Sequence, residues 1–300
     1  MGNEQTLDNS KASKSGDLFL IASVIAWGVN FPFAKFVLAF MGPMVFSSTR
    51  YGIASILLFA ILWQQKASMK ISFREVKVLI VVGLLGVTLF QGFWAFGLKM
   101  TSASKASILV TTSPIFAALI SAFRGDRPSL VSWCGILLSL FGVAIVINNS
   151  LTEITIGIGN ITGDLLIVGA ALMWAFYTFV SEPIVSRRGA ILTTAWSMLF
   201  GATILAIVGI PSFGLQDWGS VPINGWLAWG FTAVMGAALA FVWYCAGIAR
   251  IGITRGIVYG FLIPVVAILT SVLFFGESMT LVQLFGAAIV LVGVKMTRSG

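Results

Sequence analysis

The chain has 300 residues, of which 58% are hydrophobic and only 9% are charged. A soluble domain carries roughly 25% charged residues, so this chain cannot cover a water-facing surface and most of its exterior must face lipid. Histidine is absent, and the two cysteines, Cys134 and Cys245, lie inside apolar runs. These features exclude the usual His/Cys metal sites and a disulfide framework. We therefore expect an integral membrane protein without a metal or other cofactor.

The formal net charge of +8 has two interpretations. A basic soluble protein could bind nucleic acid, whereas the basic residues of a membrane protein gather in the loops that set its topology. The apolar composition favours the second interpretation. We expect membrane lipid and a small-molecule substrate as partners, no nucleic acid, and function as a monomer.

The chain begins with a polar, serine-rich stretch, and residues 1–16 are predicted to form a disordered tail. Ten apolar runs long enough to cross a bilayer follow. Because these runs are apolar on all sides, they predict helices and not the alternating strands of a barrel. Their predicted bounds are 17–40, 43–64, 75–97, 104–123, 130–147, 163–185, 189–210, 222–247, 253–275 and 279–296.

The basic residues orient these spans. If the N-terminus lies in the cytoplasm, fourteen of the 18 lysines and arginines fall on the cytoplasmic side, and only Lys99 and Lys105 fall outside. Lys35 and Arg50 lie within spans. Cytoplasmic loops carry the excess of basic residues in membrane proteins, so both termini are predicted to be cytoplasmic.

The two halves of the chain resemble each other. Gly16-Asp17-Leu18 and Trp27 match Gly163-Asp164-Leu165 and Trp174 at one constant offset. Pro114 and Pro264 match further along the chain. Because each half holds five spans, an odd number, the second half must enter the membrane from the opposite face. We predict inverted repeats at 17–148 and 163–296, with a periplasmic linker at 149–162 and a short cytoplasmic tail at 297–300. Such repeats are typical of transporters with a substrate site at their interface.

The segments WGVNFPFAK at 27–35, RGDRPSLVSWCGILLSLFGV at 124–143 and GDLLIVGAALMWAFYTFVSEP at 163–183 resemble the drug/metabolite transporter superfamily, in particular its ten-helix EamA-type exporters. The resemblance covers nearly the whole chain. It implies a secondary transporter that exports amino acids or other metabolites across the bacterial inner membrane. Overall likeness extends to aromatic amino-acid exporters of the YddG type.

Polar and aromatic side chains inside the spans are the candidate substrate-binding residues, because they are unfavourable against lipid and suit a cavity for an amphipathic solute. Each could instead only bond a neighbouring helix. The candidates are Trp27, Asn30, Lys35, Gln91, Trp94, Thr111, Trp174, Tyr177, Trp243, Tyr244 and Tyr259.

Three charged residues within the spans could have functional or structural roles. Lys35 could attract a substrate carboxylate or extend to the outer interface. For Arg50 a structural role, such as bonding helix ends, is preferred. Glu182 is expected to form an ion pair with Arg187 or Arg188, or to act in a gate.

Pro114 and Pro264 are predicted to lie mid-helix in matching spans. A proline there removes a backbone hydrogen bond and kinks the helix, so both are candidate hinges. A fixed kink without motion is the alternative.

The favoured function is therefore secondary export of aromatic or other hydrophobic amino acids and related metabolites by alternating access. Efflux of hydrophobic or cationic drugs is the alternative within transport. An enzyme acting on lipid is less favoured, because the chain has no histidine and no cluster of carboxylates that could act as general acid and base.

Overall fold

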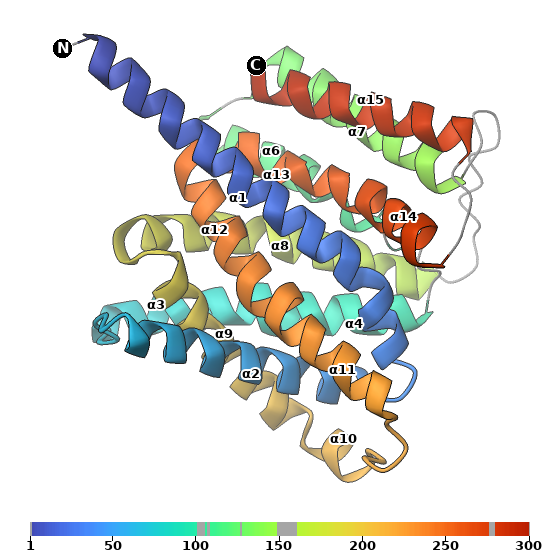
Figure 1. Cartoon of the computed structure of the whole chain (residues 1–300). Helices are drawn as coiled ribbons and strands as arrows, with labels where there is room; N and C mark the ends of the chain where they lie inside the picture. The colour runs from blue at the N-terminus through green and yellow to red at the C-terminus, as the bar shows by residue number, and fades with distance from the viewer. Residues whose placement is uncertain are drawn as a thin grey trace.

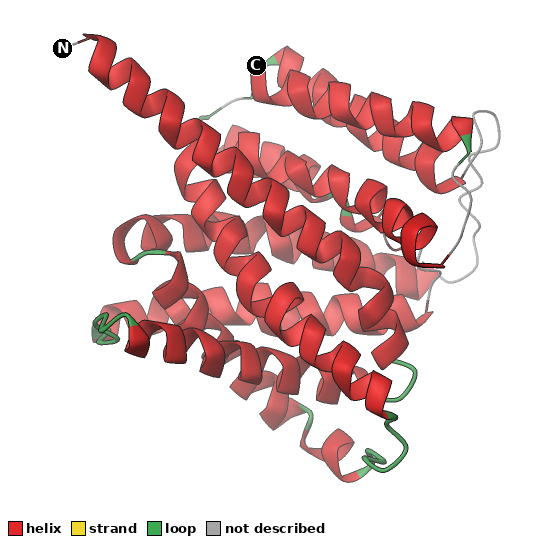
Figure 2. Cartoon of the chain, in the orientation of Figure 1, coloured by secondary structure: helices red, strands yellow, loops and turns green. Residues whose placement is uncertain are grey.

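The computed structural model describes residues 2–100, 106, 109–126, 128–148, 161–275 and 280–299. Within these ranges the chain is helical, with connecting loops and no strand (Figure 2). The elements in chain order are α1 (Gly2–Val37), α2 (Pro43–Gln64), α3 (Phe73–Gly83), η1 (Leu84–Leu89), α4 (Phe90–Met100), α6 (Ser113–Phe123), α7 (Leu130–Asn148), α8 (Ile161–Arg188), α9 (Ala190–Val208), α10 (Ile210–Gly214), α11 (Ile223–Phe231), η2 (Thr232–Leu239), α12 (Ala240–Ile251), α13 (Ile253–Ile257), η3 (Val258–Phe261), α14 (Leu262–Phe275) and α15 (Leu281–Ser299).

The helices have the length and composition of membrane spans. Six apolar helical stretches in the described ranges are at least 18 residues long, and four shorter apolar helices complete the set. Their outward-facing positions carry large apolar side chains such as Ile56, Leu227 and Leu284. This exterior suits lipid and confirms the predicted all-helical, ten-span architecture.

The spans run roughly parallel to one another, and both chain ends lie at the same end of the bundle (Figure 1). At one edge α7 packs along α15, and at the other edge α2 packs along α9. Between these edges α1 packs on α12, and α8 packs on α4. Each of these contacts joins one half of the chain to the other, so the halves are interlocked.

The contact between α7 and α15 depends on glycines that match in the two repeats. A methyl group on Gly142 would lie 2.8 Å from the carbonyl oxygen of Gly286, and one on Gly135 would lie 2.6 Å from that of Gly293. Small residues let helix backbones approach closely in lipid, where apolar side chains gain little by leaving their surroundings. The four glycines therefore form the seam between the last helices of the two halves.

A second pair of glycine contacts obeys the same symmetry. Gly16 on α1 faces Gly247 on α12, and Gly163 on α8 faces Gly97 on α4. Gly16 and Gly163 are repeat partners, and each lies at the start of the first span of its half. The first helix of each half thus packs on the third helix of the other half, as expected for inverted repeats.

The third span of each half contains a π-helical segment at its middle. These segments, η1 and η2, occupy matching positions of the two repeats. A π-helix is rare and is frequently found at functional sites.

The α-helix is interrupted just before each of the two prolines predicted to kink it. Pro114 lies in the first turn of α6, after a turn at Thr111 and Thr112. Pro264 lies in the first turn of α14, after the 3-10 segment η3. The prediction that these prolines lie inside continuous helices is therefore wrong. Proline is tolerated in the first helical turn, where its missing N–H has no intrahelical acceptor.

The predicted disordered tail also differs from the structure. Residues 2–16 continue α1 as helix, which projects beyond the bundle in Figure 1. The segment has no proline, and extending a helix that already exists adds one hydrogen bond for each residue fixed. Nearly all of the predicted linker, residues 149–160, lies outside the described ranges.

Candidate functional site

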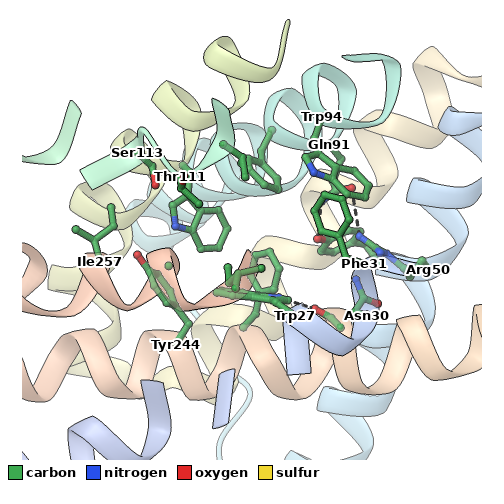
Figure 3. Close-up of a pocket in the computed structure, with 18 residues that line it drawn as sticks. Trp27, Asn30, Phe31, Arg50, Gln91, Trp94, Thr111, Ser113, Tyr244 and Ile257 are labelled. Atoms are coloured by element: carbon green, nitrogen blue, oxygen red, sulfur yellow. Dashed lines mark hydrogen bonds between the residues drawn. The ribbon is translucent and has the colours of Figure 1, made fainter. Parts of the chain in front are cut away.

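A cavity lies at the centre of the bundle, between the two halves. It contains about 770 Å³ free of protein atoms, open solvent at its mouth included. The helices that line it come from both repeats (Figure 3). Its lining residues are Trp27, Asn30, Phe31, Arg50, Tyr51, Phe90, Gln91, Trp94, Val110, Thr111, Ser113, Trp174, Gly236, Phe241, Tyr244, Ile257, Gly260 and Ile263.

One wall of the cavity consists of aromatic rings. The ring centroids of Trp27 and Trp174 are 5.2 Å apart with the planes nearly perpendicular. Tyr244 lies 5.4 Å from Trp27 and 4.9 Å from Trp174, and Phe241 packs edge-on against both tryptophans. Edge-to-face rings hold one another in place, so this wall is a rigid apolar surface.

The π-helical segment η2 fixes Trp27. The indole Nε1 of Trp27 donates a hydrogen bond of 2.9 Å to the carbonyl oxygen of Gly236, inside η2. One turn earlier on α1, the hydroxyl of Ser23 donates to the carbonyl oxygen of Ala240 at 2.8 Å. The side chains of α1 thus satisfy carbonyls at and after the irregular segment, and this places Trp27 at the cavity wall.

A polar corner faces this aromatic wall. Arg50 Nη2 donates to Gln91 Oε1 at 3.2 Å, and Gln91 Nε2 donates to the Tyr51 hydroxyl at 2.8 Å. The guanidinium carbon of Arg50 lies 4.7 Å from the ring centroid of Phe46 and 4.8 Å from that of Tyr51. Figure 3 shows Arg50, Gln91, Trp94, Phe31 and Asn30 at the same end of the pocket.

The structure brings most of the predicted substrate-binding residues to this cavity. Those that line it are Trp27, Asn30, Gln91, Trp94, Thr111, Trp174 and Tyr244. They come from the first, third, fourth, sixth and eighth spans, so polar faces of separate helices converge on the cavity.

Lys35 and Trp243 do not line the cavity. Lys35 is exposed, because a helix turns 100° for each residue and Lys35 points about 140° away from Asn30. On α12, Phe241 and Tyr244 share the face toward the cavity, and Trp243 points about 100° away from Tyr244. Placing both residues in the lining was wrong.

Tyr177 and Tyr259 are buried outside the lining. The Tyr177 hydroxyl lies 3.0 Å from the Cys245 sulfur, and its ring packs behind that of Trp174 against Gly86. The Tyr259 hydroxyl donates to the carboxylate of Asp17 at 2.9 Å. Tyr177 therefore supports the wall from behind, whereas Tyr259 ties η3 to α1.

Glu182 lies away from the cavity and forms no ion pair with Arg187 or Arg188 among the interactions of the described chain. Its carboxylate accepts a hydrogen bond from Ser186 at 3.0 Å. Arg188 instead pairs with Glu75 on α3 at 3.0 Å. The prediction of an ion pair between Glu182 and Arg187 or Arg188 is therefore wrong. The loop after α2 places Glu75 of α3 next to Arg188, and Glu75 takes the position expected for Glu182.

Sequence reasoning missed several lining residues. Arg50, assigned a structural role, faces the cavity, and Tyr51, Phe90 and Phe241 had not been singled out. The charge of Arg50 inside an apolar run was the available signal, because intramembrane charges are functional by default. The phenylalanines gave no signal, since 24 phenylalanines occur in the chain and most face lipid or core.

Within the parts of the chain that the structure describes, no group of histidine, cysteine or acidic side chains could hold a metal ion. The site therefore offers an apolar wall with hydrogen-bonding groups at one end, an arrangement that binds amphipathic molecules.

Several proteins of similar sequence are named as transporters. The uncharacterized transporter YyaM of Bacillus subtilis is 27% identical over 285 residues, covering 94% of this chain and 93% of its own length. An uncharacterized transporter of Archaeoglobus fulgidus is 28% identical over 288 residues, covering 94% and 96%.

A crystal structure of another protein superposes with a TM-score of 0.78 at 20% identity, covering 96% of both chains, which shows a shared fold. The EamA-like transporter family matches the chain twice, at residues 14–148 and 161–298, one match in each half. These two matches span nearly all of the interlocked bundle around the cavity, and the chain is a membrane transporter that belongs to the EamA-like transporter family.

Proposed function

We propose that this transporter exports aromatic or other large apolar amino acids and related metabolites across the bacterial inner membrane. The aromatic cavity between the halves carries the proposal. Its rings suit an apolar side chain, and the amide, hydroxyl and guanidinium groups at its polar corner suit the charged end of an amino acid. Dicationic drugs fit less well, because none of the described residues that line the cavity is acidic.

Alternating access is supported by contacts between the halves at the end of the bundle where the termini lie. Ser121 on α6 and Thr254 on α13 are within 3.4 Å, and Arg188 on α8 pairs with Glu75 on α3. We infer that these contacts close the cavity at this end and separate in the alternate state. The helix breaks beside Pro114 and Pro264 would supply the hinges.

The orientation proposed is that both termini face the cytoplasm. Most of the basic residues that the structure describes lie in connecting loops or near the ends of helices such as α3, α8, α12 and α15, and an excess of basic residues is typical of the cytoplasmic side of membrane proteins.

The proposal is tested by transport into proteoliposomes that contain the purified full chain. Labelled phenylalanine, tryptophan and leucine are compared with lysine, glutamate and a bis-quaternary drug, with and without a proton gradient. Saturable flux of the apolar amino acids is expected to exceed that of the charged solutes. Flux of the drug without amino-acid flux would overturn the proposal and favour drug efflux.

A further inference from the structure

Arg50 is the most deeply buried charge in the cavity. Its side chain is 2% exposed, although it lies within an apolar span. Of its three guanidinium nitrogens, Nη2 donates to Gln91, whereas Nε and Nη1 have no hydrogen-bond partner among the described residues. Buried donors without acceptors are rare in folded proteins, because they lose their bonds to water without replacement.

The protein supplies no carboxylate to this cation within the described chain. None of the cavity-lining residues is acidic. Glu75 pairs with Arg188, and Asp17 accepts a hydrogen bond from Tyr259, both outside the lining. The rings of Phe46 and Tyr51 stabilise the positive charge through their faces, but they accept no N–H hydrogen bond in the plane of the guanidinium. The charge therefore has no acidic partner, and two of its donors have no acceptor, among the described residues.

Gln91 and Tyr51 hold the guanidinium in position. Because Gln91 Oε1 accepts from Arg50 while Gln91 Nε2 donates to the Tyr51 hydroxyl, the three side chains form one chain of hydrogen bonds. This arrangement fixes the guanidinium before a ligand arrives, which lowers the entropy lost on binding.

Asn30 supplies a second unpaired group of the opposite kind. Asn30 lines the same cavity, and its buried Oδ1 atom lies beside Gly236 of η2 without a donor among the described residues. Asn30 and Arg50 lie at the same end of the pocket in Figure 3. The corner thus offers donors that lack an acceptor and an acceptor that lacks a donor.

We propose that the Arg50 guanidinium binds the carboxylate of the transported solute and that Asn30 Oδ1 accepts a hydrogen bond from its ammonium group. The inference rests on the proposed function in taking the ligand of the cavity to be the cargo, and it names the cargo's chemical class as an α-amino carboxylate. The aromatic wall of Trp27 and Trp174 then contacts the apolar side chain. A structural arginine would instead direct its free nitrogens at protein acceptors.

The test compares binding of four ligands that differ in one group each: phenylalanine, phenylalaninamide, 3-phenylpropionate and 3-phenylpropionamide. Affinities are measured by calorimetry on the full chain in detergent, and fluxes in proteoliposomes. The test variants are Arg50→Gln and Gln91→Glu. The control is Lys99→Gln, which removes a positive charge from the exposed end of α4. Gln91→Glu keeps the size of the side chain and gives Arg50 an internal carboxylate, so it tests the inference even if Arg50→Gln does not fold.

We expect Arg50→Gln and Gln91→Glu to weaken binding of phenylalanine and 3-phenylpropionate about 10- to 100-fold, the value of a hydrogen bond to a charged group. Binding of the two amides should change less than about 3-fold, and Lys99→Gln should leave all four affinities unchanged.

Two outcomes separate this inference from the proposed function. In the first outcome, Arg50→Gln or Gln91→Glu reduces the transport of phenylalanine and of phenylalaninamide by the same factor. This result would overturn the role of Arg50 and leave amino-acid export standing. Arg50-dependent binding of 3-phenylpropionate without any amino-acid flux would keep Arg50 as the carboxylate receptor and overturn amino-acid export. A wild-type protein that binds none of the carboxylates would contradict both.

Discussion

Trp27 and Trp174 meet ring to ring at the centre of the molecule, with centroids 5.2 Å apart and planes at 84°. They are partners in the internal repeat, and each comes from the first span of its half. Two equivalent residues of an inverted repeat can touch only where the pseudo-twofold axis passes between them. The contact therefore marks the centre of the inverted symmetry, and the cavity is built directly against it.

This position predicts that both tryptophans matter for transport. Trp27→Ala and Trp174→Ala each remove an aromatic wall that contacts the cargo, so the transport rate at low substrate should fall about 10-fold or more. The matched control is Trp63→Ala, whose indole is 74% exposed at the end of α2. Flux of phenylalanine per folded protein is the measurement, and normal flux in both cavity variants would show that the wall does not contact the cargo.

The topology can be checked by cysteine accessibility in a background that lacks Cys134 and Cys245. A cysteine at Phe213 should react with an impermeant reagent from outside the cell, whereas cysteines at Lys70 and Arg188 should react only after the membrane is opened. Phe213 lies in α10, whereas Lys70 lies between α2 and α3 and Arg188 ends α8; α10 and the connection from α2 to α3 lie at opposite ends of the bundle (Figure 1). Labelling of Lys70→Cys from outside intact cells would reverse the proposed orientation.

The glycine seam predicts a stability difference between two similar substitutions. A methyl group on Gly142 would lie 2.8 Å from the Gly286 carbonyl oxygen, so Gly142→Ala should push α7 from α15 and lower the free energy of unfolding by about 1–3 kcal/mol. Gly52 on α2 has open space where its methyl group would be. Gly52→Ala should be neutral or stabilising by less than about 1 kcal/mol. Thermal unfolding in detergent measures both, and equal midpoints would contradict the close contact.

We expect that Lys35 does not help the transporter to distinguish a charged cargo from an uncharged one. The sequence leaves two interpretations of this lysine open, attraction of a carboxylate and extension to the outer interface, and the structure places it on the exposed face of α1. Lys35→Ala should therefore change the transport of phenylalanine and phenylalaninamide by the same factor. A selective loss of phenylalanine transport would return the carboxylate to Lys35 and contradict its exclusion from the cavity.

The fold was largely predictable because lipid imposes simple rules. Apolar length gives the spans, and the matching of Gly16 with Gly163 and of Trp27 with Trp174 gives the repeat. The breaks before Pro114 and Pro264 and the π-helical segments were not predictable in detail. They depend on which carbonyls find other donors, as Gly236 does with Trp27, and that is decided by packing between distant segments.

The site was predictable where helical phase alone decides it. Trp27 and Asn30 on α1 and Gln91 and Trp94 on α4 are three residues apart, and each pair faces the cavity. The sequence shows that Arg50 lies within an apolar span, but not which way its side chain points. Its place at the cavity depends on contacts with Gln91 and Tyr51, which come from packing between separate helices and within α2.

Blocking the cavity tests the central claim most directly, namely that cargo passes through this space. Ser113 lines the cavity beside the break before α6, so a cysteine at this position in a background with Cys134 replaced can be modified with a bulky thiol reagent. We predict that complete modification stops phenylalanine flux in proteoliposomes and that saturating phenylalanine slows the modification. Full flux after complete modification of Ser113→Cys would show that the cargo takes another path and would contradict the account.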